Sequence, residues 1–123
     1  MTTPKIFFWV QHLLGIGHLK RTATLAKAFR RAGMDVTIVS GGHEVPGLDI
    51  ADSRLIQLPP VRAADKYFKV LIDETNSEID DAFRKRRREL LLAAYASEAP
   101  DVILTELFPF GRRQLRGELT ALL

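Results

Sequence analysis

The sequence predicts an α/β fold, in which an open, mostly parallel sheet carries helices on both faces. Short apolar runs without strict alternation, such as residues 5–11, are typical of strands that are covered on both sides. Segments whose apolar residues recur at helical spacing separate these runs, so strands and helices alternate along the chain. Glycine and proline stand where the runs end. Together these observations favour one parallel sheet between two helical layers.

The first part of the chain is expected to form a β-α-β unit. A strand over residues 5–11 leads to a helix over 19–31, in which small and apolar residues recur at helical spacing. Gly33 supplies a C-terminal stop for this helix. Residues 35–40 (DVTIVS) are rich in β-branched side chains and form a second strand. A right-handed crossover should join the two parallel strands.

The next segment, residues 54–77, is predicted to form a third strand followed by irregular structure. Residues 54–58 (RLIQL) form the strand, and the Pro59-Pro60 pair stops it. Between residues 61 and 77 the pattern is mixed, and a loop with a short helix around residues 67–72 is predicted.

The last part of the chain contributes a long helix and a fourth strand. The helix is predicted from about residue 78 to 97, with acidic residues at its start and Pro100 closing it. Residues 101–105 (DVILT) form the fourth strand. The tail, residues 114–123 (QLRGELTALL), begins a helical pattern without a capping residue after it. We therefore expect residues 1–123 to be one domain that is incomplete at its C-terminus.

Composition places the chain among ordinary globular proteins. Its 123 residues are 46% hydrophobic and 27% charged, with a formal net charge of +3. The absence of cysteine excludes disulfides, zinc-thiolate sites and cysteine nucleophiles. The first apolar run is too short for a signal peptide or a membrane span, so a cytoplasmic location is expected.

Five consecutive basic residues, 84–88 (RKRRR), concentrate the positive charge. At about 100° per residue they are spread around the whole helix instead of forming one stripe. We interpret them as a solvated surface, with Arg87 reaching out from the apolar arc to water. A basic surface for anionic lipid is the alternative, which allows peripheral contact with the inner face of a membrane. No aromatic residues interleave with the basic ones, so nucleic acid is not expected as a partner.

Candidate binding and catalytic residues follow the predicted strands. In parallel sheets of this kind ligands bind at the carboxyl ends of the strands. The stretch GIGH (residues 15–18) follows the first strand, SGGHE (residues 40–44) the second, and the fourth ends in TELFPFGRR (residues 105–113). The candidate site residues in these stretches and in the first turn of the helix are Gly15, Gly17, His18, Lys20, Arg21, Gly41, Gly42, Glu106, Arg112 and Arg113.

Two phosphate-binding motifs do not fit. Gly15 and Gly17 suggest a dinucleotide fingerprint, but Lys20 stands where its third glycine should be. Ser40 occupies the end of the second strand, where an acidic residue would hold a ribose. A P-loop is excluded because no Gly-Lys-Ser/Thr follows the turn.

The stretch QHLLGIGHLKRTATLAKAFRRAGMDVTIVSGG resembles the opening of glycosyltransferases of the GT-B type, which are built from two Rossmann-like domains. In that family a Gly-x-Gly-His or Gln-Gly-His turn leads from the first strand into an Ala/Leu-rich helix. LPPVRAADKYFKVLID and PDVILTELFPFGRRQLRGEL resemble a bacterial group of predicted glycosyltransferases. That group is distantly similar to the enzyme that adds N-acetylglucosamine to the lipid-linked peptidoglycan precursor.

The resemblance implies a catalytic pair. In related plant-type transferases the histidine of this turn is the general base on the acceptor hydroxyl, and an acidic residue after a later strand orients it. The matching positions are His18 and Glu106, although the plant-type partner is usually aspartate. Histidine titrates near neutral pH, and a carboxylate on its other nitrogen would select the tautomer. Alternatively, His18 only caps the helix or satisfies a buried carbonyl.

The basic residues beside the pair allow two interpretations. Lys20 and Arg21 lie where a helix begins, and their charge opposes the helix dipole there. They either attract donor phosphates or an anionic acceptor, or are simply exposed. Arg112 and Arg113 carry the same alternatives.

The resemblance also implies what the whole protein would need. By family analogy the donor would be a nucleotide sugar, namely a UDP-sugar, used without metal or other cofactor and held mainly by a second, C-terminal domain. The acceptor would be a sugar or lipid-linked hydroxyl. Residues 1–123 would then be the acceptor-side, N-terminal half, inactive alone. A stand-alone acceptor-binding or regulatory subunit of a split transferase and a part of a sugar-nucleotide epimerase are the alternatives.

Overall fold

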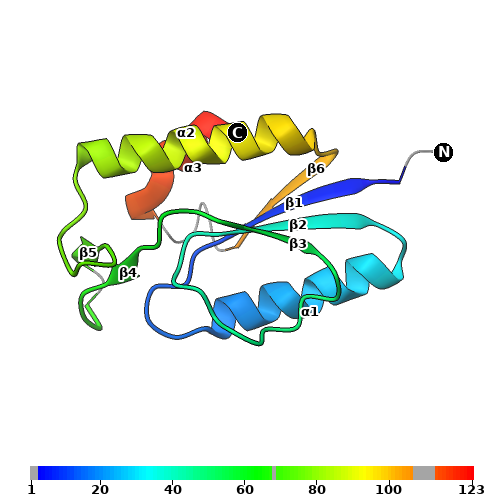
Figure 1. Ribbon diagram of the computed structural model, residues 1–123, viewed down its shortest axis with the longest axis horizontal. Coiled ribbons are helices and arrows are strands. Elements are labelled where there is room, and N and C mark those ends of the chain that lie inside the picture. Colours follow the sequence, from blue (N-terminus) through cyan, green and yellow to red (C-terminus); the bar gives the residue numbers. More distant parts are fainter. Residues whose placement is uncertain (1–2, 68, 107–112) are drawn as a thin grey trace.

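A parallel sheet flanked by helices forms the centre of the computed structural model, which describes residues 3–67, 69–106 and 113–123 (Figure 1). The prediction of an α/β fold with an open, mostly parallel sheet is thereby confirmed. In the described residues this sheet has four strands, with the order β3-β2-β1-β6 and parallel pairing throughout. The bounds of these strands are β1 Lys5–Val10, β2 Asp35–Ser40, β3 Arg54–Gln57 and β6 Val102–Thr105.

Helices cover both faces of the sheet. The helix α1 (Gly17–Arg31) lies on one face, and α2 (Asp81–Glu98) lies on the other together with α3 (Arg116–Leu122) (Figure 1). A single turn of 3-10 helix, η1 (Arg113–Leu115), leads into α3. The carboxyl ends of the strands and the start of α1 lie at the same end of the molecule, so loops from several strands meet there.

The strand β1 supplies side chains to the cores on both faces, which explains its unbroken apolar pattern. Ile6 and Val10 belong to the cluster that packs on α1. Phe7 and Trp9 point to the opposite face and pack with residues of α2 and α3. The ring of Phe7 meets that of Tyr95 edge to face, with centroids 6.1 Å apart. Side chains that alternate between the two faces of β1 therefore enter two apolar cores, and neither face of the strand is exposed to solvent.

The short helix predicted around residues 67–72 is wrong. The segment instead contributes a strand, β5 (Leu71–Ile72), which pairs antiparallel with β4 (Arg62–Ala63). The described residues just before β5, 64–67 and 69–70, are exposed, whereas both residues of β5 are buried. Backbone pairing with β4 therefore decides the structure of this segment, although Tyr67 and Leu71 stand four positions apart as in a helical pattern.

The helix α2 begins three residues later than the start predicted at Glu78. Glu78 forms a bridge with Ile72, and the backbone N–H of Ile79 donates to the carbonyl of Leu71 at 3.0 Å. These contacts extend the hairpin and delay the helix. Asp80 then caps it by accepting a hydrogen bond of 2.8 Å from the backbone N–H of Phe83.

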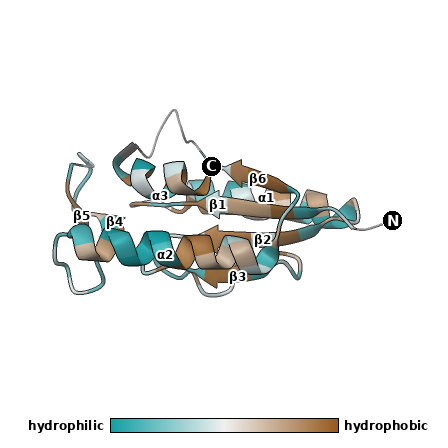
Figure 2. Cartoon of the chain, turned by 90° about the horizontal axis from the view of Figure 1, so that it is seen from above, coloured by the Kyte–Doolittle hydropathy of each residue, from teal (hydrophilic) through white to brown (hydrophobic). Residues whose placement is uncertain are grey.

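Arg87 corrects the interpretation of the basic run. The first half of α2 is hydrophilic and the second half hydrophobic (Figure 2), as its sequence requires. Arg84, Lys85, Arg86 and Arg88 keep some exposure, but Arg87 is 0% exposed and does not reach water. It forms an ion pair with Glu118 of α3 instead. The carboxylate of Glu118 compensates the buried positive charge, as water would do if the side chain reached the surface.

Candidate active site

His18 and Glu106 are brought together by the pairing of β1 with β6. His18 lies in the first turn of α1, and Glu106 follows β6 directly. The backbone N–H of Glu106 donates to the carbonyl of Trp9 at 3.0 Å, which continues the parallel ladder past the last strand residue. The imidazole Nδ1 of His18 then lies 3.0 Å from Oε1 of Glu106, across 88 positions of sequence. The two predicted members of a catalytic pair are therefore in hydrogen-bonding contact.

The guanidinium of Arg21 joins this pair from the next turn of α1. Its Nη2 lies 2.9 Å from Nδ1 of His18 and also donates to Oε1 of Glu106. The carboxylate of Glu106 accepts a hydrogen bond from Arg21 in either tautomer of the imidazole. Arg21 therefore has an acceptor whether or not Nδ1 carries a proton. The contact between Nδ1 and Glu106, by contrast, requires a proton on Nδ1. The Nδ1–H tautomer satisfies the contact with Glu106 and leaves Nε2 as the basic nitrogen of the neutral ring, whereas in the Nε2–H tautomer Nδ1 would accept from Arg21.

Exposure of the pair suits a reaction with a bound substrate. The side chain of His18 is 31% exposed and that of Glu106 is 12% exposed. The histidine is thus accessible, while the carboxylate that orients it is largely shielded from water. Shielding strengthens the electrostatic effect of Glu106 on the ring.

The start of α1 is open and lacks the usual stabilising groups. Ile16 stands at the N-cap and forms no side-chain hydrogen bond, and the first turn contains no acidic residue. Gly15 and Gly17 are exposed, and a Cβ added to either would meet no atom within 4 Å. Lys20 is exposed one turn into the helix. The backbone N–H groups at this helix start are therefore available to a ligand, and their dipole favours a negative one.

Gly41 and Gly42 lie in the loop after β2 but have a clear packing role. A Cβ on Gly41 would come within 2.1 Å of Oε1 of Gln11, and one on Gly42 within 2.3 Å of Cε1 of His12. Both glycines are buried. Close packing between the loops after β1 and β2 therefore accounts for these glycines without a substrate.

The basic residues predicted at the end of the fourth-strand motif are not placed. Arg112 and the side chain of Arg113 lie outside the described part of the structure. The backbone of Arg113 begins η1.

Sequence reasoning missed a network that fixes the loops at the carboxyl ends of the strands. Nη2 of Arg87 donates to Oε1 of Gln11, which follows β1, at 2.9 Å. Its Nη1 donates to the carbonyls of Gly41, after β2, at 3.0 Å and of Pro59, after β3, at 2.6 Å. The signal available in the sequence was an arginine within the apolar arc of its helix. Its partners are 28 to 76 positions away, so periodicity alone could not identify them.

Comparison with protein-family models, curated proteins and solved structures finds no match to this chain. Within the described residues, no helix is long and apolar enough to cross a membrane. The same part of the chain contains no group of three or more histidine, cysteine, aspartate or glutamate side chains arranged to hold a metal ion.

Proposed function

We propose that this chain is the acceptor-side domain of a glycosyltransferase that transfers a sugar from a nucleotide-sugar donor to a hydroxyl acceptor. The observation that supports this proposal is the 3.0 Å contact between Nδ1 of His18 and Oε1 of Glu106. It links a histidine at the carboxyl edge of a parallel sheet, where ligands of such folds bind, to a shielded carboxylate. This is the arrangement of a general base with an orienting partner.

In the proposed reaction the acceptor hydroxyl loses its proton to Nε2 of His18. The hydroxyl oxygen forms a bond to the anomeric carbon of the donor. The bond between that carbon and the nucleoside diphosphate breaks, and the diphosphate leaves with the electron pair. Glu106 holds Nδ1–H throughout and stabilises the imidazolium that forms. Its partner Arg21 keeps the carboxylate in place.

The remaining parts of the proposal follow the family resemblance. The donor is a uridine nucleotide sugar held mainly by a second domain, and the acceptor is a sugar or lipid-linked hydroxyl. The open start of α1, with exposed Gly15, Gly17 and Lys20, is the place on this chain where an anionic group of either substrate would be received.

A turnover assay on the protein expressed from its complete reading frame tests the proposal. Nucleotide sugars are screened with and without hydroxyl acceptors, and release of nucleoside diphosphate is measured. A transferase releases the diphosphate in an acceptor-dependent manner, whereas an epimerase converts the donor without any acceptor.

The informative variant is His18→Asn. The asparagine amide can still donate to Glu106, but it provides no base in place of Nε2. We expect turnover to fall by about 10²- to 10⁴-fold. His43→Asn, which changes a histidine outside the pair, is the matched control and should retain turnover. Full activity in His18→Asn would refute the assignment of the base.

A further inference from the structure

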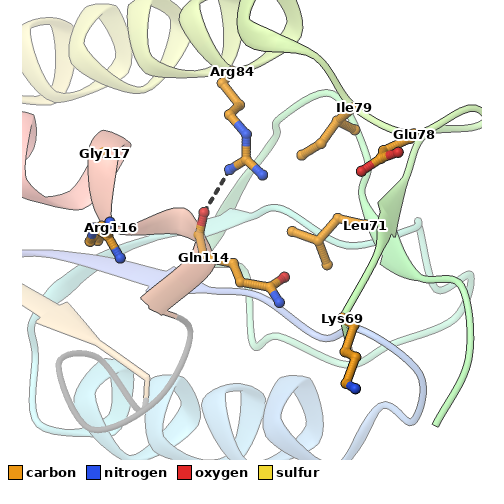
Figure 3. Close-up of a pocket in the computed structure, with 8 residues that line it drawn as sticks. All are labelled: Lys69, Leu71, Glu78, Ile79, Arg84, Gln114, Arg116 and Gly117. Carbon is orange, nitrogen blue, oxygen red and sulfur yellow. Dashed lines mark hydrogen bonds between the residues drawn. The ribbon is translucent and has the colours of Figure 1, made fainter. Parts of the chain in front are cut away.

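A pocket of about 440 Å³ lies between the start of α2, the strand β5 and the segment that leads into α3 (Figure 3). It combines charged and apolar walls. Lys69, Arg84 and Arg116 supply basic side chains, and Glu78 supplies an acidic one. Neither His18 nor Glu106 lines it, so the pocket is separate from the candidate active site.

The described part of the chain does not neutralise the basic side chains of this pocket. Among the described residues, no carboxylate lies within 4.0 Å of a nitrogen of Lys69, Arg84 or Arg116. Glu78 lines the same pocket but forms no ion pair with any of them there. Three positive charges against one negative charge leave an excess that favours an anionic ligand.

One of the three cations is held in a defined orientation. Nη1 of Arg84 donates to the backbone carbonyl of Gln114 at 2.6 Å, and Figure 3 shows the side chain reaching from α2 toward that carbonyl. The guanidinium is half-buried, which shields its charge from water. A guanidinium fixed in this way loses less conformational entropy on binding and can present its remaining N–H groups to oxygen atoms.

Apolar side chains form the part of the pocket wall next to Arg84. Leu71 and Ile79 extend into the pocket in Figure 3, and they are only 3% and 8% exposed. They belong to the main core cluster, so this wall is part of the folded interior and not a mobile surface. A ligand that fits both walls carries an anionic group and an organic part.

We propose that this pocket binds a phosphate or diphosphate ester. Guanidinium groups match phosphate oxygens geometrically, and lysine adds a point charge. The volume lies within the range of about 300–1,000 Å³ that is usual for small-molecule sites. The organic part of the ester packs on Leu71 and Ile79.

A neighbouring hollow extends the positive potential. It has a volume of about 370 Å³, and Arg84 lines it as well. Arg88 adds a further basic side chain there, and so does Lys85, which forms an ion pair of 4.0 Å with Glu89; the carboxylates are those of Asp81 and the already paired Glu118. A second negative charge on the ligand, as in a diphosphate, would be favoured by this arrangement.

Calorimetric titration with inorganic diphosphate tests the proposal on the 123-residue chain. We expect saturable binding that weakens as sodium chloride is added. Lys69→Gln and Arg116→Gln should each raise the dissociation constant by about tenfold or more, because each removes a charge-assisted contact. Arg31→Gln, which removes an exposed arginine at the end of α1, is the matched control and should leave the constant unchanged.

Arg84→Gln is the less decisive variant because Arg84 also holds the carbonyl of Gln114, and its loss can loosen η1. Lys69 and Arg116 form no side-chain hydrogen bond among the described residues, so their variants should fold as the parent does. His18→Asn should bind diphosphate normally, which separates this inference from the proposed function. No saturable binding, or equal binding by the parent, Lys69→Gln and Arg116→Gln, would overturn the proposal.

A second experiment, with lipid vesicles, identifies the source of the phosphate. Co-sedimentation is measured with phosphatidylcholine vesicles, with and without phosphatidylglycerol. The pocket is assigned to a lipid headgroup if the chain binds to phosphatidylglycerol vesicles, if diphosphate displaces it from them, and if Lys69→Gln abolishes the binding. Diphosphate binding by a chain that leaves both kinds of vesicle in solution assigns it to a soluble phosphate ester.

Discussion

The guanidinium of Arg87 and the carboxylate of Glu118 form a doubly hydrogen-bonded ion pair inside the protein. Nε of Arg87 donates to Oε2 and Nη2 donates to Oε1, each at 2.9 Å. The side chains are 0% and 4% exposed. Together with Gln11, Gly41 and Pro59, Glu118 satisfies all the N–H donors of the guanidinium. One side chain of α2 thereby links α3 to the loops that follow three strands.

We predict that Glu118→Gln lowers the free energy of unfolding by about 3–5 kcal/mol, because it leaves the charge of Arg87 buried without a counter-charge. Urea denaturation monitored by the fluorescence of Trp9 measures the loss. The double variant Arg87→Met/Glu118→Leu removes both charges and should be more stable than Glu118→Gln. If the double variant is the less stable of the two, the packing of the pair matters more than its charge.

The tautomer of His18 can be checked directly in this chain. We predict that nitrogen NMR finds the proton on Nδ1 in the parent at a pH where the imidazole is neutral, since Glu106 accepts from that atom. In Glu106→Ala the proton should redistribute toward Nε2. A parent ring protonated mainly on Nε2 would mean that Nδ1 accepts from Arg21 instead, and Glu106 would lose its orienting role.

The glycines of the two loops should respond to alanine in opposite ways. Gly15→Ala and Gly17→Ala place a methyl group in open space at negative φ. We expect equal or higher stability, by about 0.4–1 kcal/mol, because the unfolded chain loses freedom. Gly41→Ala and Gly42→Ala force a methyl group into the buried side chains of Gln11 and His12, at a cost of about 1–3 kcal/mol or more. Thermal unfolding of the four variants measures the difference.

In an active full-length protein these variants also test the role of the turn. Gly15→Ala and Gly17→Ala should reduce turnover or substrate affinity while the fold is preserved, since the added methyl groups occupy the space proposed for a ligand. Unchanged kinetic constants in both variants would remove the start of α1 from the site.

Acid stability should depend on a cluster at the amino edge of the sheet. Arg54 donates to both oxygens of Asp35 at 3.1 Å and also to Glu98. The hydrogen bond from Arg54 holds the pKa of Asp35 below its usual value, aided by the charges of Arg54, Lys5 and Arg30 against the opposing effect of burial.

The sign of the pH effect follows from that lowered pKa. Because Asp35 is a stronger acid in the folded state, its pair contributes stability above the unfolded pKa of about 3.9. The contribution is lost as the pH falls from there through the folded value. Arg54→Gln should cost about 1 kcal/mol at pH 7 and much less at a pH below the folded value, as measured by urea unfolding. An equal loss at both pH values would assign the effect to packing.

Local patterns identified the main strands and helices because those patterns are set by neighbours in sequence. Residues 35–40 and 101–105 were predicted as strands, and the structure has β2 and β6 there. The hairpin of β4 and β5 was missed because its pairing joins two-residue strands that carry no periodicity. A segment that short is decided by its backbone partners and not by its own propensity.

By itself, the sequence determined that His18 and Glu106 each follow a strand of one parallel sheet, which places both at the same edge. Only the tertiary structure decided that β6 lies next to β1, so that the two side chains meet across 88 positions. The burial of Arg87 was decided in the same way, since Glu118 and Gln11 reach it from other elements. Periodicity tells which face of an element is covered. Which charge compensates a buried cation is a property of contacts between elements, and these exist only once the chain has folded.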